Sequence, residues 1–268
     1  MSLGIRVVDA FAQRAFTGNP AGVCILAEAL DAKIMQSIAL EVNAAETAFL
    51  VKNGEDYDLR WFTPMAEIDL CGHATLASAH VLLTEGHASP DKMIRFNTRS
   101  GVLTAKRLSD GWIQLDFPAV ASAKTTEIDA VKAALGVATK SLLKTRVDYL
   151  VELNSEREVR EFAPNLPAIQ ALGTQGVIIT SKAGGQYDFV SRYFAPNVGI
   201  NEDPVTGSAH CALAPYWQTQ LGKSEFMAFQ ASPRGGVLRL KTTGSRVMLE
   251  GQAVTTITGE IRVDWSIT

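Results

Sequence analysis

The chain has 268 residues, of which 47 % are hydrophobic and 20 % charged, and it contains no low-complexity tract. This length has room for two domains and buries a core that needs neither disulfides nor metal ions to fold. The net charge of −3 argues against a nucleic-acid-binding surface and against a polybasic segment that binds membranes.

The sequence indicates neither export nor insertion into a membrane. Residues Met1–Gly4 run directly into the strand-like segment Ile5–Phe11, a pattern unlike a signal peptide, and no window approaches eighteen uninterrupted apolar residues. The three cysteines, Cys24, Cys71 and Cys211, form neither a Cys-x-x-Cys pair nor a zinc-spaced cluster. We therefore expect a cytoplasmic protein with reduced cysteines, no membrane contact and no metal.

The two halves of the sequence resemble each other. Arg60–Pro64 (RWFTP) matches Arg192–Pro196 (RYFAP) 132 residues later, and Gly101–Leu103 matches Gly236–Leu238 135 residues later. Three further matches fall in the same order with offsets between 130 and 135: Tyr57-Asp58 with Tyr187-Asp188, Gly72–Ala74 with Gly207–Ala209, and Gln114–Asp116 with Met248–Glu250. Five matches in one order indicate one structural unit used twice.

Each copy has the pattern of strands followed by a buried helix. Strand-like runs at 48–51 and 177–180 end in glycine-containing turns, and each has a partner strand, at 59–62 and 189–194. The helices expected at about 72–85 and 206–221 are small and apolar on nearly every face, which predicts burial. The predicted fold class is α+β, with two pseudo-symmetric halves that are each an antiparallel sheet or open barrel around a central helix.

The remaining elements place the domain boundaries. Asp31 is expected to cap a helix that reaches about Asn43, and a second surface helix is expected at 126–135. The stretch 118–124 is the expected linker between the halves. We predict an N-terminal half of residues 1–120, joined by a returning last strand within 259–268, and a C-terminal half of residues 121–258.

Two helix starts rich in small residues are candidate binding sites for an anion. Gly72 and Gly207 open the two expected helices, and free backbone N–H groups with the positive end of the helix dipole attract a carboxylate or phosphate there. Glycine lets a ligand approach the backbone closely. Because related halves pack about a pseudo-two-fold axis, we expect both starts to line one cleft.

Polar side chains at these starts have a structural and a chemical reading. His73 and Asp203 each lie at one helix start. His73 is either a surface or structural residue or a substrate contact. Asp203 is either a helix cap or a substrate contact. Cys71 is either a small buried hydrophobic residue or a thiolate activated by the helix N-terminus.

Glu46 opens a strand that is otherwise apolar, and the second half has no carboxylate at the equivalent place, Thr174–Val177. A scaffold that is copied twice but carries glutamate once points to a role specific to that position. Partial burial would raise a glutamate pKa toward neutrality and suit it to proton transfer. A solvent-exposed glutamate at a sheet edge is the alternative.

Four segments together resemble the phenazine-biosynthesis PhzF-like isomerases: Phe16–Val23, Asn43–Phe49, Gly72–Thr75 and Glu202–Ala209. The resemblance covers essentially the whole chain. It implies the diaminopimelate-epimerase fold and an isomerase that acts without a cofactor on a small cyclic carboxylate. Family members are often homodimers, and the same is expected here.

The resemblance also implies roles for individual residues. Glu46 moves a proton between substrate atoms, and His73 and Asp203 position or polarise the substrate. The residues implied to contact the anionic group of the substrate are Gly72, Gly207 and Ser208, with Cys71 and Thr206 beside them.

Departures from the phenazine enzyme's pattern keep other functions open. Ala74 follows the Gly-His pair, and Pro204-Val205 separates Asp203 from Thr206, so phenazine-precursor chemistry does not follow. Cys71 stands where the epimerases place one catalytic thiol, and the opposite loop offers no second cysteine. A cysteine-assisted epimerase or racemase, with Asp203 or Glu46 as the opposing base, is one alternative. A catalytically silent metabolite-binding protein is the other.

Overall fold

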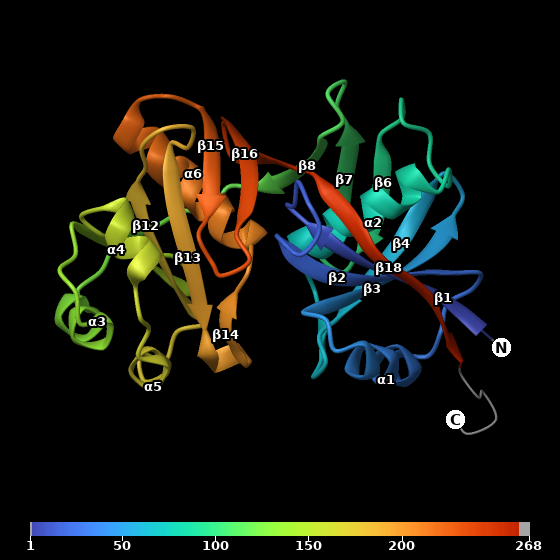
Figure 1. Cartoon of the computed structure of the whole chain (residues 1–268), viewed down its shortest axis with the longest axis horizontal. Helices are drawn as coiled ribbons and strands as arrows, with labels where there is room; N and C mark the ends of the chain where they lie inside the picture. Colours follow the sequence, from blue (N-terminus) through green and yellow to red (C-terminus); the bar gives the residue numbers. More distant parts are fainter. Residues whose placement is uncertain (1, 263–268) are drawn as a thin grey trace. The chain divides into compact units, whose positions relative to one another are not determined.

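The computed structural model describes residues 2–262, which form two compact units (Figure 1). Unit 1 consists of residues 2–116 and 250–262, and unit 2 consists of residues 117–249. The expected boundaries of independently folding domains, 1–120 with 259–268 and 121–258, stay a prediction. Residues 263–268 of the expected last strand lie outside the described residues.

Unit 1 is a mixed sheet that wraps around one buried helix. Its strands are β1 (Ser2–Ala10), β2 (Asn19–Leu26), β3 (Glu46–Asn53), β4 (Asp56–Phe62), β5 (Glu67–Ile68), β6 (Ile94–Thr98), β7 (Gly101–Arg107), β8 (Ile113–Pro118) and β18 (Ala253–Arg262), and its helices are α1 (Ala32–Val42) and α2 (Gly72–Thr84). β1 pairs with both β18 and β2 in antiparallel fashion, so that the returning strand closes on the first strand. α2 packs against β1, β2 and β3.

The two helices of unit 1 form for different reasons. α1 is amphipathic: the Asp31 side chain accepts a hydrogen bond from the Lys33 N–H, and Asn43 ends the helix in a left-handed conformation. Its buried face packs on Phe49 and Phe62. α2 has no polar face, and nine of its thirteen residues are buried, as its alanine-rich sequence predicts.

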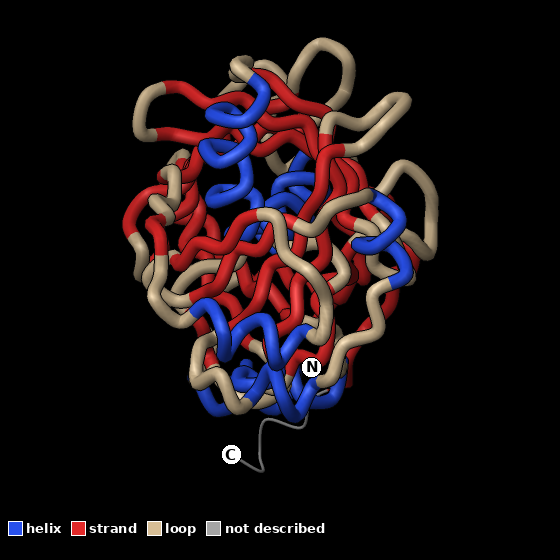
Figure 2. The backbone as a smooth tube through the Cα atoms, turned by 90° about the vertical axis from the view of Figure 1, so that its left-hand side faces the viewer, coloured by secondary structure: helices blue, strands red, loops and turns tan. Residues whose placement is uncertain are grey.

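Unit 2 repeats this plan around its own helix. Its strands are β9 (Ala123–Lys124), β10 (Ser141–Lys144), β11 (Asp148–Glu152), β12 (Gly176–Lys182), β13 (Phe189–Ala195), β14 (Ile200–Asp203), β15 (Glu225–Gln230), β16 (Gly236–Thr243) and β17 (Arg246–Gly251). Its helices are α3 (Ile128–Leu135), α4 (Glu156–Glu161), α5 (Leu166–Gln170), the 3-10 turn η1 (Pro196–Val198) and the buried α6 (Gly207–Leu221). Figure 2 shows that strands make up most of the regular backbone.

Strand pairing within each unit follows the same topology. β2 runs parallel to β3 as β11 does to β12, and β4 runs parallel to β6 as β13 does to β15. The other pairs that correspond between the units, such as β3–β4 and β12–β13, are antiparallel. The predicted α+β class with two pseudo-symmetric halves is therefore confirmed, with two parallel pairs added to each expected antiparallel sheet.

A partly buried ion pair also recurs at equivalent positions. Arg60 donates two hydrogen bonds to Glu67 at 2.7 and 2.8 Å, and Arg192 donates two to Glu202 at 2.7 and 2.9 Å. Each guanidinium also lies over a phenylalanine two residues further along its strand, at 5.2 and 5.0 Å. This ion pair belongs to the shared framework of the units.

Several details differ from the sequence-based expectation. The last strand begins at residue 253 rather than 259, because it pairs with β1 along its whole length. The helix expected at 126–135 begins at Ile128, after Glu127. The strands β10 and β11 and the short helices α4 and α5 were not expected. Within residues 2–262, no helix is long and apolar enough to cross a membrane.

Candidate functional site

The start of α2 brings three of the predicted residues together. Cys71 precedes the helix in an extended conformation, and no side chain caps the first turn. Gly72 is half-buried and His73 is buried within that turn. The first helical N–H groups therefore lack the side-chain oxygen that commonly covers them, which is the arrangement expected of an anion-binding helix start.

Glu46 reaches this helix start from the first position of β3. Its backbone pairs with Ala21 of β2 in the parallel ladder, and its side chain is buried against the helix. Glu46 Oε2 lies 2.9 Å from His73 Nε2. Neither of these two buried atoms has a hydrogen bond of good geometry to any of residues 2–262, so each retains hydrogen-bonding capacity for a bound molecule.

The other ring nitrogen of His73 faces two further groups. Nδ1 lies 3.5 Å from Cys71 Sγ and 3.3 Å from Asn19 Nδ2. Asn19 is fully buried at the start of β2. Sequence reasoning did not single it out as a site residue, although it lies within the Phe16–Val23 segment that carries the family resemblance. His73 thus bridges the Glu46 carboxylate on one side and the Cys71 thiol with Asn19 on the other.

Burial and charge act on these groups in opposite directions. Burial lowers the pKa of His73, but Cys71 and the Glu46 carboxylate beside it outweigh that effect and hold the pKa well above its ordinary value of 6.5. Burial, followed by the charge of Glu46, raises the pKa of the Cys71 thiol. The two groups that face His73 therefore favour the protonated form of its ring.

One ligand atom from each of Glu46, Cys71 and His73 lies within 4.8 Å of the others, which raises the question of a metal ion. One imidazole nitrogen binds one ion. Here Nε2 faces Glu46 and Nδ1 faces Cys71, so the ring lies between the other two groups instead of pointing with them to a common centre. This arrangement fits a chain of proton-transfer groups better than a metal site.

The start of α6 gathers the predicted residues of unit 2. Asp203 ends β14 and is buried, and its Oδ2 accepts a hydrogen bond from the Thr206 hydroxyl. Gly207 and Ser208 follow as the first helical residues, the glycine buried and the serine exposed. The structure thus places the predicted residues in two clusters, one in each unit. Their expected convergence on one cleft stays a prediction.

The place of Glu46 in unit 1 is taken by Gly176 in unit 2, as the strand registers show. A side chain there is excluded, because a Cβ atom on Gly176 would lie 2.5 Å from the Tyr193 ring and hydroxyl. The Tyr193 hydroxyl instead donates a hydrogen bond to Asp148 Oδ1 at 2.9 Å. The carboxylate of the cluster is therefore specific to unit 1.

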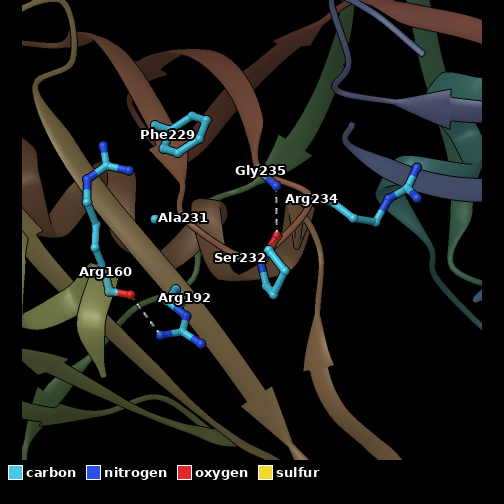
Figure 3. Close-up of a pocket in the computed structure, with 8 residues that line it drawn as sticks. Arg160, Arg192, Phe229, Ala231, Ser232, Arg234 and Gly235 are labelled. Atoms are coloured by element: carbon cyan, nitrogen blue, oxygen red, sulfur yellow. Dashed lines mark hydrogen bonds between the residues drawn. The ribbon is translucent and has the colours of Figure 1, made fainter. Parts of the chain in front are cut away.

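A cavity of about 360 Å³ opens in unit 2 beside the loop 231–235 (Figure 3). Three arginines line it: Arg160, Arg192 and Arg234. Arg192 binds Glu202 and three backbone carbonyls, and Arg160 binds Glu156 and lies over Phe229. Since the charges of Arg192 and Arg160 are paired within the fold, we do not assign the substrate to this cavity.

Comparison with known proteins assigns the chain to a family. The family model described as "Phenazine biosynthesis-like protein" (PhzC-PhzF) matches residues 8–259. The chain belongs to this family. A protein of Halalkalibacterium halodurans named as an uncharacterized isomerase is 49 % identical, over 97 % of this chain and 99 % of that protein. The family is one of isomerases, and the chain is an isomerase.

Solved structures agree with this assignment. A PhzF-family protein of Enterococcus faecalis superposes with a TM-score of 0.93 at 42 % identity, covering 98 % of this chain and 100 % of the other. A hydroxyproline epimerase of Agrobacterium vitis, 13 % identical, superposes with a TM-score of 0.61 over 97 % of this chain and 92 % of its own. The second likeness shows the fold alone, and the diaminopimelate-epimerase-like fold predicted from sequence is confirmed.

Proposed function

We propose that this isomerase moves a proton on a small carboxylate-bearing substrate without a cofactor, with Glu46 as its general acid and base. The observation that supports this role is a buried carboxylate whose Oε2 pairs with His73 Nε2 at 2.9 Å and makes no hydrogen bond of good geometry to residues 2–262. A buried carboxylate that is held by a histidine next to an uncapped helix start is suited to receive a proton from a bound substrate.

The proposed reaction has two steps. Glu46 takes a proton from an activated substrate carbon, so that a C–H bond breaks, an O–H bond forms and the electron pair moves into the adjacent conjugated system. The same O–H bond then breaks as the proton passes to a different substrate atom. The imidazolium of His73 stabilises the Glu46 carboxylate before and after the transfer, and the backbone N–H groups at Gly72 and His73 bind the substrate carboxylate.

The residues of unit 2 complete the proposal. Asp203 would position or polarise the substrate, and Gly207 and Ser208 would bind its anionic group at the start of α6. Thr206 would lie beside that group, since its N–H and hydroxyl donate to Gln230 and Asp203. That both helix starts serve one substrate is supported by the family resemblance. A cytoplasmic homodimer is proposed on the same ground, and light scattering coupled to size-exclusion chromatography tests the dimer.

A second candidate function is a cysteine-assisted epimerase, which the 3.5 Å contact between Cys71 Sγ and His73 Nδ1 favours. The raised pKa of the Cys71 thiol disfavours it, because the thiol is protonated at neutral pH. Replacing Cys71 by serine separates the two functions. Turnover survives in Cys71→Ser if Glu46 is the base, and is lost if the thiol carries the proton.

Hydrogen exchange with solvent tests the proposed reaction class. The protein, dialysed against a chelator and without added cofactor, is incubated in D₂O with a panel of small cyclic carboxylic acids, and deuterium on carbon is measured by mass spectrometry. We expect incorporation into at least one acid, faster than in protein-free controls. Binding of an acid without any incorporation would instead identify a catalytically silent binding protein.

A further inference from the structure

A fully buried glutamine lies beneath the start of α6. Gln230 is the last residue of β15, and its side-chain amide makes three hydrogen bonds to the loop that carries Asp203. Its Oε1 accepts from the Thr206 N–H at 2.8 Å. Its Nε2 donates to the Asp203 carbonyl at 2.7 Å and to Thr206 Oγ1 at 3.2 Å. The amide therefore holds both the backbone and the hydroxyl of the residue that contacts the Asp203 carboxylate.

Only one orientation of this amide satisfies its neighbours. If the oxygen and nitrogen of Gln230 were exchanged, Oε1 would face the Asp203 carbonyl oxygen, and Nε2 would face the Thr206 N–H, pairing acceptor with acceptor and donor with donor. In the observed orientation the Thr206 hydroxyl accepts from Gln230, and its single proton goes to Asp203 Oδ2. The chain of donation runs from Gln230 through Thr206 to Asp203, and each bond polarises the next.

His210 fixes Thr206 from the opposite side. Burial lowers the pKa of His210 to about 4, so the ring is neutral at working pH. A carbonyl only accepts, so Nδ1 carries the proton and donates to the Thr206 carbonyl at 2.8 Å. Its Nε2 then accepts from the Ser191 hydroxyl at 3.4 Å. The backbone of Thr206 is thus held by Gln230 at its N–H and by His210 at its C=O. Its hydroxyl is held separately by Gln230 and Asp203.

Unit 1 lacks both the amide and the carboxylate that it serves. Thr98 ends β6 as Gln230 ends β15, but its hydroxyl donates to the Gly101 carbonyl instead of contacting the start of α2. Ile68 pairs with Trp61 where Asp203 pairs with Tyr193. The shared fold forms in unit 1 without such an amide, which favours a role connected with Asp203 over a role in folding.

We propose that Gln230 is a positioning residue that orients the Asp203 carboxylate through the Thr206 hydroxyl. The functional part of this inference rests on the proposed role of Asp203 in the substrate site. The hydrogen-bond relay itself is a property of the unliganded protein and is measured without any substrate.

The test is an NMR titration of the whole chain with ¹³C-labelled aspartate, which follows the Asp203 carboxyl carbon with pH. Gln230→Met keeps the side-chain volume but removes the donor, and Thr206→Val removes the hydroxyl. Each is expected to raise the measured pKa of Asp203 by about one, because both remove stabilisation of the carboxylate. The double variant is expected to match Thr206→Val alone, since Gln230 acts through Thr206.

Controls separate this relay from a general loss of structure. Thr98→Val, at the position in unit 1 that corresponds to Gln230, is expected to leave the titration of Asp203 unchanged. Thr206→Ser keeps the hydroxyl and is expected to keep the wild-type pKa of Asp203. If Gln230→Met does not fold, the comparison of Thr206→Val with Thr206→Ser still tests the hydroxyl through which Gln230 acts. An unchanged pKa in Thr206→Val, or additive effects of the two substitutions, would overturn the proposal. A confirmed relay with full deuterium exchange in Asp203→Asn would contradict the catalytic role of Asp203 alone.

Discussion

The starts of α2 and α6 occupy equivalent places in two units of the same topology, yet they carry different chemistry. At α2 the extended residue before the first helical glycine is Cys71, whereas at α6 it is Thr206. The carboxylate at α2 comes from the neighbouring strand β3, whereas at α6 it comes from the preceding strand β14. The duplicated fold thus supplies two helix starts, and substitutions around them give each its own set of acids, bases and hydrogen-bond donors.

Some features are kept in both units, and these belong to the framework. The ion pairs Arg60–Glu67 and Arg192–Glu202 recur with nearly the same geometry. The helix starts are also braced alike: Thr75 donates to the Cys71 carbonyl as His210 donates to the Thr206 carbonyl. Features that recur in both units support the fold, and features found in one unit only are candidates for a role in catalysis or binding. We therefore expect substitutions of the two kinds to have different effects.

The largest expected effect on stability follows from the recurring ion pair. Arg192→Met should lower the free energy of unfolding by about 3–5 kcal/mol, because it leaves Glu202 without its partner and three backbone carbonyls without a donor. Arg60→Met should cost about 1 kcal/mol, since the Arg60 side chain is 33 % exposed against 9 % for Arg192. Urea denaturation measures both. Equal losses would show that the extra contacts of Arg192 contribute nothing.

The side chain that donates to the residue before the helix is His210 at α6 and Thr75 at α2. Only the histidine titrates. His210 has a folded-state pKa of about 4 against an ordinary value of 6.5, so below pH 6.5 the unfolded chain binds a proton that the folded chain does not. Stability should therefore fall by about 3 kcal/mol as the pH drops from 6.5 to 4. His210→Thr, which copies Thr75 of unit 1, should remove this contribution. An unchanged pH dependence in that variant, measured by denaturation at several pH values, would contradict the assignment.

In unit 2 the position equivalent to Glu46 is Gly176, where the Tyr193 ring leaves no room for a side chain. Adding one methyl group at Gly176 tests this. Gly176→Ala should cost about 1–3 kcal/mol, because the new Cβ would lie 2.5 Å from the Tyr193 ring. The matched control is Gly184→Ala, where no atom lies within 4 Å, and it should change stability by less than about 0.5 kcal/mol. If the two variants unfold alike, Tyr193 moves aside easily and unit 2 is open to a second carboxylate.

The smallest effect concerns the thiol at α2. Because burial and the charge of Glu46 raise the pKa of Cys71, its thiolate should form only above pH 9, and iodoacetamide should modify it slowly at pH 7. Burial also raises the pKa of Cys24 and of Cys211 to about 12. Cys71 is 6 % exposed against 0 % for Cys24 and 3 % for Cys211, so Cys71 should react first of the three. Peptide mapping with Cys71→Ser as a control identifies the labelled residue. Rapid labelling of Cys71 at pH 7 would revive the epimerase hypothesis.

Much of this organisation was predictable from the sequence, because it depends on local patterns. Alanine-rich segments predicted α2 and α6 within one or two residues, and matched segments predicted the repeat. The absence of a carboxylate from the second copy singled out Glu46, and the helix start singled out His73 and Cys71. These are statements about positions along the chain, and hydrophobic patterning and capping rules apply to them directly.

Other features depend on contacts between distant segments. Asn19 meets His73 across 54 residues and Gln230 meets Thr206 across 24, and no local pattern distinguishes these amides from surface ones. The parallel pairs β2–β3 and β11–β12 were missed because an apolar strand does not identify its partner or direction. The short helices α4 and α5 contain too few residues to show a helical period.

The most direct test of Glu46 as the proton-transferring residue is the rate of proton exchange in Glu46→Gln. With an acid that the wild-type protein deuterates in D₂O, we expect this variant to lose at least about 100-fold in rate while retaining its fold and its affinity for the acid. Glu41→Gln, an exposed glutamate on α1, should keep the wild-type rate. Exchange at the wild-type rate in Glu46→Gln would contradict the assignment of Glu46 as the proton-transferring residue.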